Sequence, residues 1–280
     1  MHLVYHPEAV TLIPLSFTAL QVWSVAGMAK LLIDADFIVY KCCAAAEDEI
    51  DWSEDVVLVT SRFSEAYKAV IGEIDKVVKE FGEHSEPILF FSHFENFRKK
   101  IYPEYKGHRN RKKPCGYKRV ISSLHDDYHV IILPELEADD SMGIYATKYP
   151  GNVIVSPDKD MRQIPGPLYD FKEYTLINET DGRNWHYIQT LAGDATDGYS
   201  GVPGIGVKRA VALFEKTGYN WQTIKDAFAA KDLDEDMALM NARLAKILTK
   251  DYYDDKRRIP ILWSPETDNR DDSRTGSGIT

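Results

Sequence analysis

The stretch KLLID (residues 30–34) is a short apolar run that ends in a carboxylate. Three more runs of the same kind follow it: PILFFS (87–92), VIILP (130–134) and NVIVS (152–156). Between the runs, apolar residues recur at helical spacing. One such segment carries Val59, Phe63, Val70, Ile74, Val77 and Phe81, and a second extends from Leu136 to Tyr149. Short buried strands that alternate with helices indicate an α/β fold with a mostly parallel sheet flanked by helices.

The rest of the chain is organised around this core. Residues 30–183 are predicted to form the sheet domain, and residues 184–263 a helical region. Its predicted helices are Trp185–Gly193, Val207–Lys216, Trp221–Ala229 and Asp234–Thr249. Residues 264–280 lack an apolar pattern and are predicted to be disordered. In residues 1–29 the apolar stretch has no Lys or Arg before it, which favours an appended or misassigned start over a signal peptide.

Composition excludes several classes of protein. With 280 residues, 44% hydrophobic and 28% charged, the chain is not wholly disordered, collagen-like or a disulfide scaffold. Cys42, Cys43 and Cys115 form no CxxC pair and favour a reducing, cytosolic compartment. We expect a monomer without membrane attachment. The net charge of −10 argues at first against nucleic acid, but a total does not show how charge is distributed.

Acidic residues follow three of the predicted strands, and a further group lies after the helix that begins at Trp185. The candidates are Asp34, Glu137, Asp139, Asp140, Asp158, Asp160, Asp194 and Asp197. The carboxyl ends of parallel strands meet at one edge, where clustered carboxylates repel each other unless cations neutralise them. Two Mg²⁺ or Mn²⁺ ions would suit these oxygen ligands and would activate water for phosphoryl displacement. A single Asp after a strand is usually a helix cap, so the clustering carries the metal interpretation.

A basic segment extends from Arg98 to Arg119, with ten Lys or Arg and one acid. Its charge of +9 leaves −19 for the rest of the chain. Tyr102, Tyr105 and Tyr117 lie among these cations, and such a mixture forms a stacking surface for single-stranded bases. The alternative is a solvated flexible loop. The position between carboxylate-bearing segments favours phosphate contact.

The turn GVPGIGVKRA (201–210) is rich in glycine. Gly204 and Gly206 allow a tight turn and close approach of a phosphate backbone. The N–H groups that open the next helix, with Lys208 and Arg209, supply an anion site. The turn is not a nucleotide-binding P-loop. A purely structural helix–turn–helix is the alternative, and sequence-independent binding of duplex DNA fits the backbone character of the turn.

Five motifs stand in a familiar order: LIDAD, YPEYKGHR, LEADD, SPDKD and LAGDATDGYSGVPGIGVKRA. From about Lys30 to Trp263 the chain resembles the 5′-nuclease (flap endonuclease) superfamily, most of all the phage 5′–3′ exonucleases of the T7 gene 6 and T5 types. The resemblance implies a PIN-like nuclease core and a C-terminal helix–three-turn–helix region that binds DNA. Members of the superfamily remove nucleotides from 5′ ends, cut 5′ flaps and often remove RNA primers.

The resemblance also assigns roles by motif. It places Asp34, Glu137, Asp139 and Asp140 at one metal position, and Asp158, Asp160, Asp194 and Asp197 at a second, with Asp34 and Asp158 counted as catalytic. Lys106 and Arg109 would contact the scissile phosphate, and Tyr105 would stack on the terminal base. The further predicted DNA contacts are Arg98, Lys99, Arg111, Lys112, Lys113, Gly204, Gly206, Lys208 and Arg209. A K⁺ ion would lie at Leu191, Ala192, Ser200, Val202 and Ile205.

The chain departs from the family pattern at two positions. Ala35 stands where relatives usually have Gly, a change that we expect to be tolerated. His93 stands where relatives usually carry an Asp, and imidazole is a poorer Mg²⁺ ligand than carboxylate. We therefore predict a metal preference shifted toward Mn²⁺. The check compares cleavage rates in Mg²⁺ and Mn²⁺ for the wild type and His93→Asp; equal rates in both ions and both proteins would refute it.

The predicted activity is a metal-dependent 5′–3′ exonuclease with 5′-flap endonuclease activity on DNA, which leaves 5′-phosphates and serves replication or repair. DNA with 5′ ends or flaps, RNA–DNA hybrids and replication proteins are the expected partners. One alternative is an RNase H-like primer-removing 5′ nuclease. A phosphohydrolase that uses Asp34 and Asp36 would leave the basic segment unexplained. A non-catalytic DNA-structure-binding protein is disfavoured, since uncompensated carboxylates repel DNA.

Overall fold

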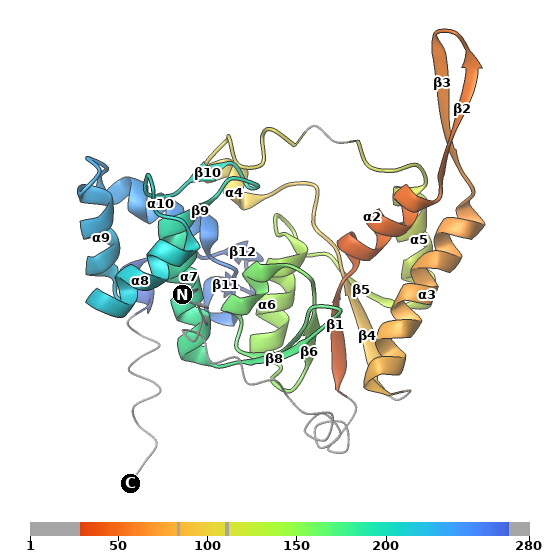
Figure 1. Ribbon diagram of the computed structural model, residues 1–280. Helices are drawn as coiled ribbons and strands as arrows, with labels where there is room; N and C mark the ends of the chain where they lie inside the picture. The colour runs from red at the N-terminus through yellow and green to blue at the C-terminus, as the bar shows by residue number, and fades with distance from the viewer. Residues whose placement is uncertain (1–28, 83–84, 110–111, 269–280) are drawn as a thin grey trace, which may run out of the picture.

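A computed structural model describes residues 29–82, 85–109 and 112–268. Its centre is a six-stranded sheet in the order β5-β4-β1-β6-β7-β8 (Figure 1). The strands are β1 (Lys30–Asp34), β4 (Glu86–Phe90), β5 (His129–Ile131), β6 (Val153–Val155), β7 (Gly166–Tyr169) and β8 (Tyr174–Ile177). All neighbours pair in parallel except β7 and β8, which are antiparallel. The predicted mostly parallel sheet is confirmed. The strands β7 and β8 were not predicted, since each has only four residues and β7 carries Gly and Pro.

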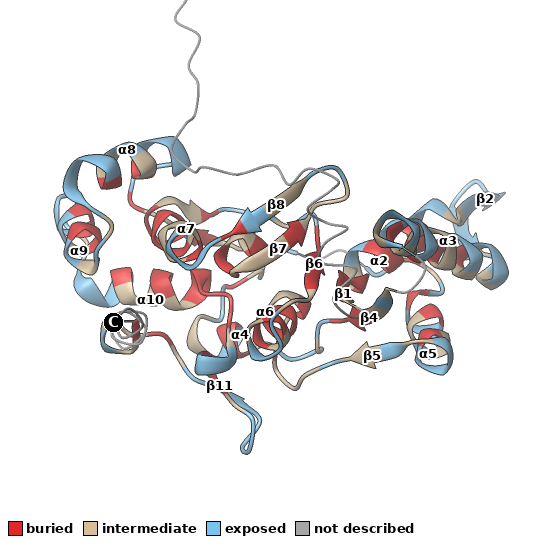
Figure 2. Cartoon of the chain, turned by 90° about the horizontal axis from the view of Figure 1, so that it is seen from below, coloured by how far each residue is buried: buried red, intermediate tan, exposed pale blue. Residues whose placement is uncertain are grey.

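Helices cover both faces of the sheet because its central strand is apolar on both sides. Successive side chains of a strand point to opposite faces. Leu31 and Ile33 of β1 therefore pack in the core formed with α2 (Ala35–Ala45), α3 (Phe63–Phe81) and α5 (Tyr117–Asp127). Leu32 packs on the other face, in the core that includes α6 (Ala138–Lys148). Figure 2 shows the buried residues concentrated along β1, β4 and β6 between these layers.

A hairpin of β2 (Glu47–Ser53) and β3 (Val56–Ser61) extends away from the sheet (Figure 1). The helical spacing of apolar residues predicts that Val59 belongs to the helix that follows. That prediction was wrong, because α3 begins only at Phe63. The run of β-branched residues just before it favours a strand over a helix.

The C-terminal region packs around an apolar core of its own, which includes Leu191, Phe214 and Trp263. It contains α7 (Glu179–Ala192), α8 (Val207–Thr217), α9 (Trp221–Ala229) and α10 (Glu235–Ala245), and α4 (Phe97–Ile101) lies beside it. The four predicted helices are present, although α7 begins earlier and α10 ends earlier than predicted. In the described part of the chain, no helix is long and apolar enough to cross a membrane.

Short elements complete the C-terminal half. They are η1 (Lys159–Gln163), η2 (Lys250–Tyr252), the hairpin of β9 (Gly193–Asp194) and β10 (Tyr199–Ser200), and the hairpin of β11 (Tyr253–Asp254) and β12 (Ile259–Pro260). The prediction of disorder from residue 264 onward was wrong for the first residues of that stretch. Asp268 is 7% exposed and accepts a hydrogen bond from the Tyr187 hydroxyl. Residues 1–28 and 269–280 lie outside the described residues.

Candidate active site

Two neighbouring strands bring the first carboxylates together. Asp34 ends β1, where its Oδ1 accepts a hydrogen bond from the backbone N–H of Phe37 (3.3 Å) and so caps α2. Ser156 follows β6, and its hydroxyl donates to Asp34 Oδ2 (3.1 Å). The same hydroxyl accepts a hydrogen bond from the N–H of Asp158 (3.2 Å), which caps η1 through Asp160. Ser156 thus joins the carboxyl ends of β1 and β6.

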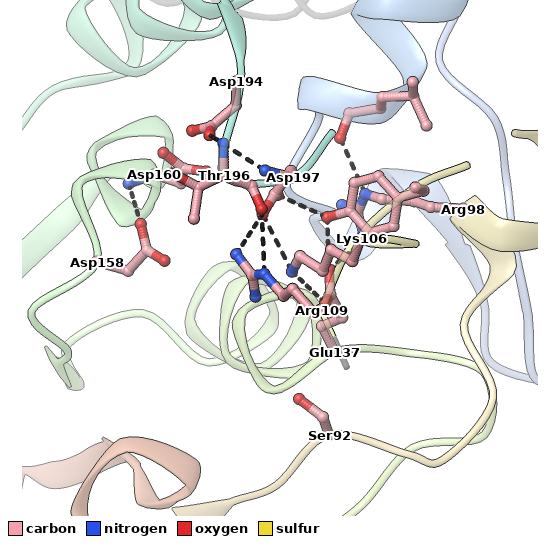
Figure 3. Close-up of polar contacts among 12 residues, drawn as sticks. Ser92, Arg98, Lys106, Arg109, Glu137, Asp158, Asp160, Asp194, Thr196 and Asp197 are labelled. Carbon is pink, nitrogen blue, oxygen red and sulfur yellow. Dashed lines mark hydrogen bonds and ion pairs between the residues drawn. The ribbon is translucent and has the colours of Figure 1, made fainter. Parts of the chain in front are cut away.

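The other carboxylates come from a helix start and a hairpin. Glu137, Asp139 and Asp140 open α6, where Glu137 and Asp140 form a capping box. Negative side chains at a helix N-terminus are favoured by the orphan N–H groups there. Asp194 lies in β9 and Asp197 in the turn after it, and Asp194 Oδ1 accepts the N–H of Thr196 (2.7 Å). Figure 3 shows Glu137, Asp158, Asp160, Asp194 and Asp197 in one neighbourhood.

Four of the eight carboxylates are paired with basic side chains. Lys106 Nζ contacts Glu137 Oε1 and lies 3.6 Å from Asp197 Oδ1. The remaining pairs are Arg109 with Asp197 (2.9 Å), Lys159 with Asp194 (2.9 Å) and Arg98 with Asp140 (2.6 Å). Burial alone would raise the pKa of Glu137, but Lys106 and Arg98 outweigh it and lower that pKa to about 2. Glu137 is therefore charged at neutral pH.

The other four, Asp34, Asp139, Asp158 and Asp160, have no ion pair within the described residues. Burial, followed by repulsion from Asp36, raises the pKa of Asp34 to about 7. Burial and then Asp158 raise the pKa of Asp160 to about 7 in the same way, although Lys159 opposes this shift. Burial and neighbouring carboxylates thus make ionisation of these groups unfavourable unless a cation is present.

Asp139 is the most isolated member of this unpaired set. Burial, followed by repulsion from Asp158 and Asp34, raises its pKa well above the ordinary value. Its Oδ1 is buried and has no hydrogen-bond partner among the described residues. A bound cation would supply the missing partner of this oxygen and would neutralise the repulsion among the carboxylates.

The donor set fits hard divalent cations in its chemistry, since it is made of carboxylate oxygens. As the side chains stand, however, no three Asp, Glu, His or Cys groups in the described ranges are arranged to hold a metal ion. Lys106, Arg109 and Lys159 contact several of the oxygens instead.

Asp140 is not available as a metal ligand, contrary to the sequence prediction. It is 0% exposed, and Arg98 Nη1 and Nη2 donate to its two oxygens at 2.6 and 2.8 Å. Its Oδ1 also accepts the N–H of Leu248 (3.1 Å). The carboxylate is fully used in holding α6 against the C-terminal region.

The prediction that Arg98 contacts DNA was wrong for the same reason. The side chain is 1% exposed, and it also donates to the carbonyl oxygens of Leu244 (2.9 Å) and Lys246 (2.5 Å). A guanidinium with a planar fork of donors can satisfy a buried carboxylate and two carbonyls at once. Arg98 is a structural residue.

Tyr105 cannot stack on a base, as had been predicted, because it is 2% exposed. Its hydroxyl lies within hydrogen-bond distance of Glu137 Oε2 (2.9 Å) and Asp197 Oδ2 (2.8 Å), and its single proton can be donated to either oxygen. The next residue, Lys106, has a φ of 54°, and its N–H donates to the carbonyl of Asp197 (2.7 Å). Lys106 and Arg109 both point toward Asp197 (Figure 3), so the sequence pair YK presents the lysine and buries the tyrosine.

The remaining residues predicted to contact DNA lie on the surface or outside the described residues. Lys99, Lys112, Lys113 and Lys208 are exposed, and Arg111 lies outside the described residues. Gly204 has a φ of 82°, which favours glycine, whereas Gly206 has extended backbone with open space around it. Arg209 is exposed, and its Nη1 donates to the Gly204 carbonyl (2.6 Å), which ties the turn to α8.

The predicted potassium residues do lie together. The N–H of Val202 donates to the carbonyl of Leu191 (2.8 Å), which joins the turn to the end of α7. A pocket of about 490 Å³ is lined in part by Ala192, Ser200, Val202 and Ile205. No described contact tests whether an ion binds there, so this assignment stays a prediction.

Three contributors to the site were missed by the sequence analysis. Lys159 pairs with Asp194, Ser156 joins two strand ends, and Gln189 donates from α7 to Asp160 Oδ1. The position of Lys159 between the two aspartates of SPDKD was an available signal. Gln189 offered none, because its contact depends on how α7 packs. His93 Nδ1 accepts the N–H of Glu95 (3.2 Å), and its predicted effect on metal choice stays a prediction.

The sequence matches the family model described as 5′-3′ exonuclease, N-terminal resolvase-like domain, over residues 29–181. The chain belongs to the 5′–3′ exonuclease family. The exodeoxyribonuclease of Enterobacteria phage T3 is 28% identical over 85% of this chain and 93% of its own length. The exonuclease of Escherichia phage T7 is 28% identical over 84% and 93%. Family membership and these relatives make the protein a nuclease.

Solved structures share the fold. A phage T5 protein co-crystallised with metal ions has a TM-score of 0.61 at 15% identity, covering 78% of this chain and 89% of that one. The catalytic core of Rad2 in complex with DNA substrate has a TM-score of 0.56 at 13% identity, covering 95% and 92%. At these identities the likeness establishes the mixed α/β architecture alone.

Proposed function

We propose that the protein is a metal-dependent 5′–3′ exonuclease with 5′-flap endonuclease activity on DNA, which hydrolyses phosphodiesters to 5′-phosphate products in replication or repair. One observation carries the proposal: four carboxylates without an ion-pair partner in the described chain share one site with Glu137 and Asp197, which Lys106 and Arg109 contact (Figure 3). Carboxylates that can bind metal ions, together with basic side chains that can bind phosphate, suit phosphodiester hydrolysis.

Two Mg²⁺ or Mn²⁺ ions would be held by the carboxylates of this site. Asp34, Glu137 and Asp139 would serve one position, and Asp158, Asp160, Asp194 and Asp197 the other. When bound, such ions activate water and stabilise the oxygens of an in-line displacement. Lys106 and Arg109 would bind the scissile phosphate and neutralise its charge in the transition state. The Tyr105 hydroxyl lies between Glu137 and Asp197 and can donate its proton to either carboxylate, which helps to orient this pair.

The regions on either side of the site would hold the DNA. The basic segment 98–119 runs from α4 to α5 across the carboxyl ends of the strands (Figure 1), with Lys99, Lys112 and Lys113 exposed along its described part. The 5′ strand would pass along it. The C-terminal region would act as a helix–three-turn–helix that grips the duplex through Gly204, Gly206, Lys208 and Arg209, with K⁺ bound at the turn.

We also propose that the chain divides into two regions between residues 183 and 184, that it is a monomer, and that replication proteins are its partners. We propose a cytosolic location as well, which the free state of all three cysteines supports. Removal of RNA primers from RNA–DNA hybrids is the second candidate activity. The phosphohydrolase alternative is weakened by Asp36. Its Oδ2 accepts the N–H of Ser92 (2.7 Å) and its Oδ1 accepts the Tyr117 hydroxyl, so it is not free as a proton donor.

A 5′-labelled flap duplex tests the proposal. We expect cleavage with Mg²⁺ or Mn²⁺, none with EDTA, and products that carry a 5′-phosphate. Asp158→Asn should lower kcat by a factor on the order of 1,000, since a metal site supplies several kcal/mol of transition-state stabilisation. Wild-type turnover by Asp158→Asn would refute the two-metal assignment. The same assay with blunt, 5′-overhang and RNA–DNA substrates ranks the two candidate activities.

A further inference from the structure

Phe94 is the most exposed large apolar side chain that the described residues contain, with 88% of its surface open to solvent. It lies in the loop 92–96 between β4 and α4 (Figure 1), at the carboxyl edge of the sheet. A phenyl ring left in water forgoes about 2 kcal/mol of burial energy. Single exposed apolar residues are common, so exposure alone means little. Two further features distinguish Phe94: its place at the border of the candidate active site and the hydrogen bonds that fix the loop that carries it.

The loop begins within the candidate active site. The N–H of Ser92 donates to Asp36 (2.7 Å), and the Ser92 hydroxyl accepts the N–H of Ala138 (3.1 Å), which lies between Glu137 and Asp139 in the chain. Figure 3 shows Ser92 bordering the group of polar residues. Two residues of chain span at most about 7 Å. The backbone of Phe94 therefore lies within about 7 Å of Ser92, at the border of the candidate site.

The ring is presented by a fixed loop. The N–H of His93 donates to the carbonyl of Leu136 (2.9 Å), and that of Phe97 donates to the carbonyl of Glu135 (3.0 Å), so both ends of the loop are tied to the start of α6. The His93 ring lies 4.2 Å from the Phe94 ring, centroid to centroid, at an angle of 37°. A pre-ordered aromatic surface loses little conformational entropy when a ligand packs against it.

The chemistry of the surroundings selects the ligand. Lys106 and Arg109 can bind a phosphate, and an exposed aromatic ring at the border of the same site suits the base of a neighbouring nucleotide. One ring is far too small for a protein interface, which buries about 800 Å² on each partner. Base stacking also tolerates any sequence. Tyr105, which carried this role in the sequence prediction, is buried.

We propose that Phe94, supported by His93, is the positioning residue on which an unpaired base next to the scissile phosphate stacks. The inference rests on the proposed nuclease function and adds the residue that orients the single strand.

Substrate kinetics with matched variants test this inference. We compare Phe94→Ala, Phe94→Tyr and, as control, Trp52→Ala, which removes another exposed aromatic ring (72% exposed) from the β2–β3 hairpin. On DNA with a 5′ single-stranded extension, Phe94→Ala should raise KM about tenfold, which corresponds to about 1.4 kcal/mol and lies within the range for one stacked base. Phe94→Tyr and Trp52→Ala should stay within about twofold of the wild type, on the same scale.

Abasic substrates separate stacking from a structural effect. When the base at the contacted nucleotide is removed, the KM of the wild type should rise to that of Phe94→Ala, and the KM of Phe94→Ala should not change. A base analogue, 2-aminopurine, at that nucleotide should be quenched on binding to the wild type and not to Phe94→Ala. Unchanged KM in Phe94→Ala, or a defect that persists on every abasic substrate, would overturn the proposal. The quenching does not need cleavage, so a wild type that binds but fails to cut would count against the nuclease proposal alone.

Discussion

Replacing Asp139 by Asn should stabilise the metal-free protein and at the same time abolish cleavage. The carboxylate is buried, its Oδ1 has no partner within the described chain, and Asp158 and Asp34 repel it. A neutral amide removes the repulsion, so we expect the free energy of unfolding in EDTA at pH 8 to rise by on the order of 1–3 kcal/mol. Because the oxygens would hold a catalytic ion, kcat should fall by a factor on the order of 1,000.

The pH dependence gives this prediction a sign that can be checked. The pKa of Asp139 is raised in the folded protein above its ordinary value of 3.8. Below pH 3.8 the group is neutral in both states, so Asn has no advantage there. As the pH rises through the folded pKa, the unfolded chain carries the charge more easily and wild-type stability is lost. The advantage of Asn should therefore be small at pH 4 and largest at pH 8.

Urea unfolding at several pH values in EDTA measures the difference in free energy of unfolding between the wild type and Asp139→Asn. The same measurement is then repeated with Mg²⁺. Ions that bind only the folded protein should stabilise the wild type and have much less effect on Asp139→Asn. Asp126→Asn, an exposed aspartate of α5, is the matched control and should change neither stability nor kcat. An Asp139→Asn protein that is less stable than the wild type at pH 8 would contradict the account of the site.

Replacing Arg98 by Met should destabilise the fold by about 3–5 kcal/mol, the usual cost of removing one partner from a buried ion pair. Asp140, at 0% exposure, would be left charged with only backbone N–H groups as donors. The carbonyls of Leu244 and Lys246 would lose the donors that Arg98 supplies. Met retains most of the apolar volume, so the loss reports on charge and hydrogen bonding.

A neighbouring variant and a double variant make this result interpretable. Lys99→Met removes the same kind of charge from the exposed next position and should cost less than about 0.5 kcal/mol. Arg98→Met combined with Asp140→Asn should regain part of the lost stability, since the uncompensated charge is gone while an acceptor for Leu248 remains. If the double variant is no more stable than Arg98→Met, the uncompensated charge of Asp140 is not the cause of the loss.

The parallel sheet could be predicted because its strands are short apolar runs with helices between them. The same logic placed the acidic residues at one edge, since that edge follows from strand direction alone. The extent of α9 was predicted to the residue, Trp221–Ala229, because Asn220 caps it and its apolar pattern is clear. The β2–β3 hairpin was missed because Val59 also fits the helical spacing of Phe63 and the residues that follow it.

The roles of Arg98 and Tyr105 could not be predicted from the basic segment. Inside a run of cations and tyrosines, both resemble their exposed neighbours. The partner of Arg98 lies 42 residues away in the chain, and those of Tyr105 lie 32 and 92 residues away. Burial that depends on such distant partners leaves no local pattern. The same limit explains why the division of the carboxylates into ion-paired and unpaired sets emerged only from the structure.

The projecting ribbon of β2 and β3 has a consequence for self-association. Within the described chain it pairs with no other strand, so the outer edges of both strands offer free N–H and C=O groups for pairing with another molecule. Residues 47–61 carry six acidic side chains and no Lys or Arg. Two such ribbons repel each other, and acidic edges are a known safeguard against aggregation. The negative charge of the ribbon therefore opposes edge-to-edge pairing between copies of the chain, well away from the chemistry at the strand ends.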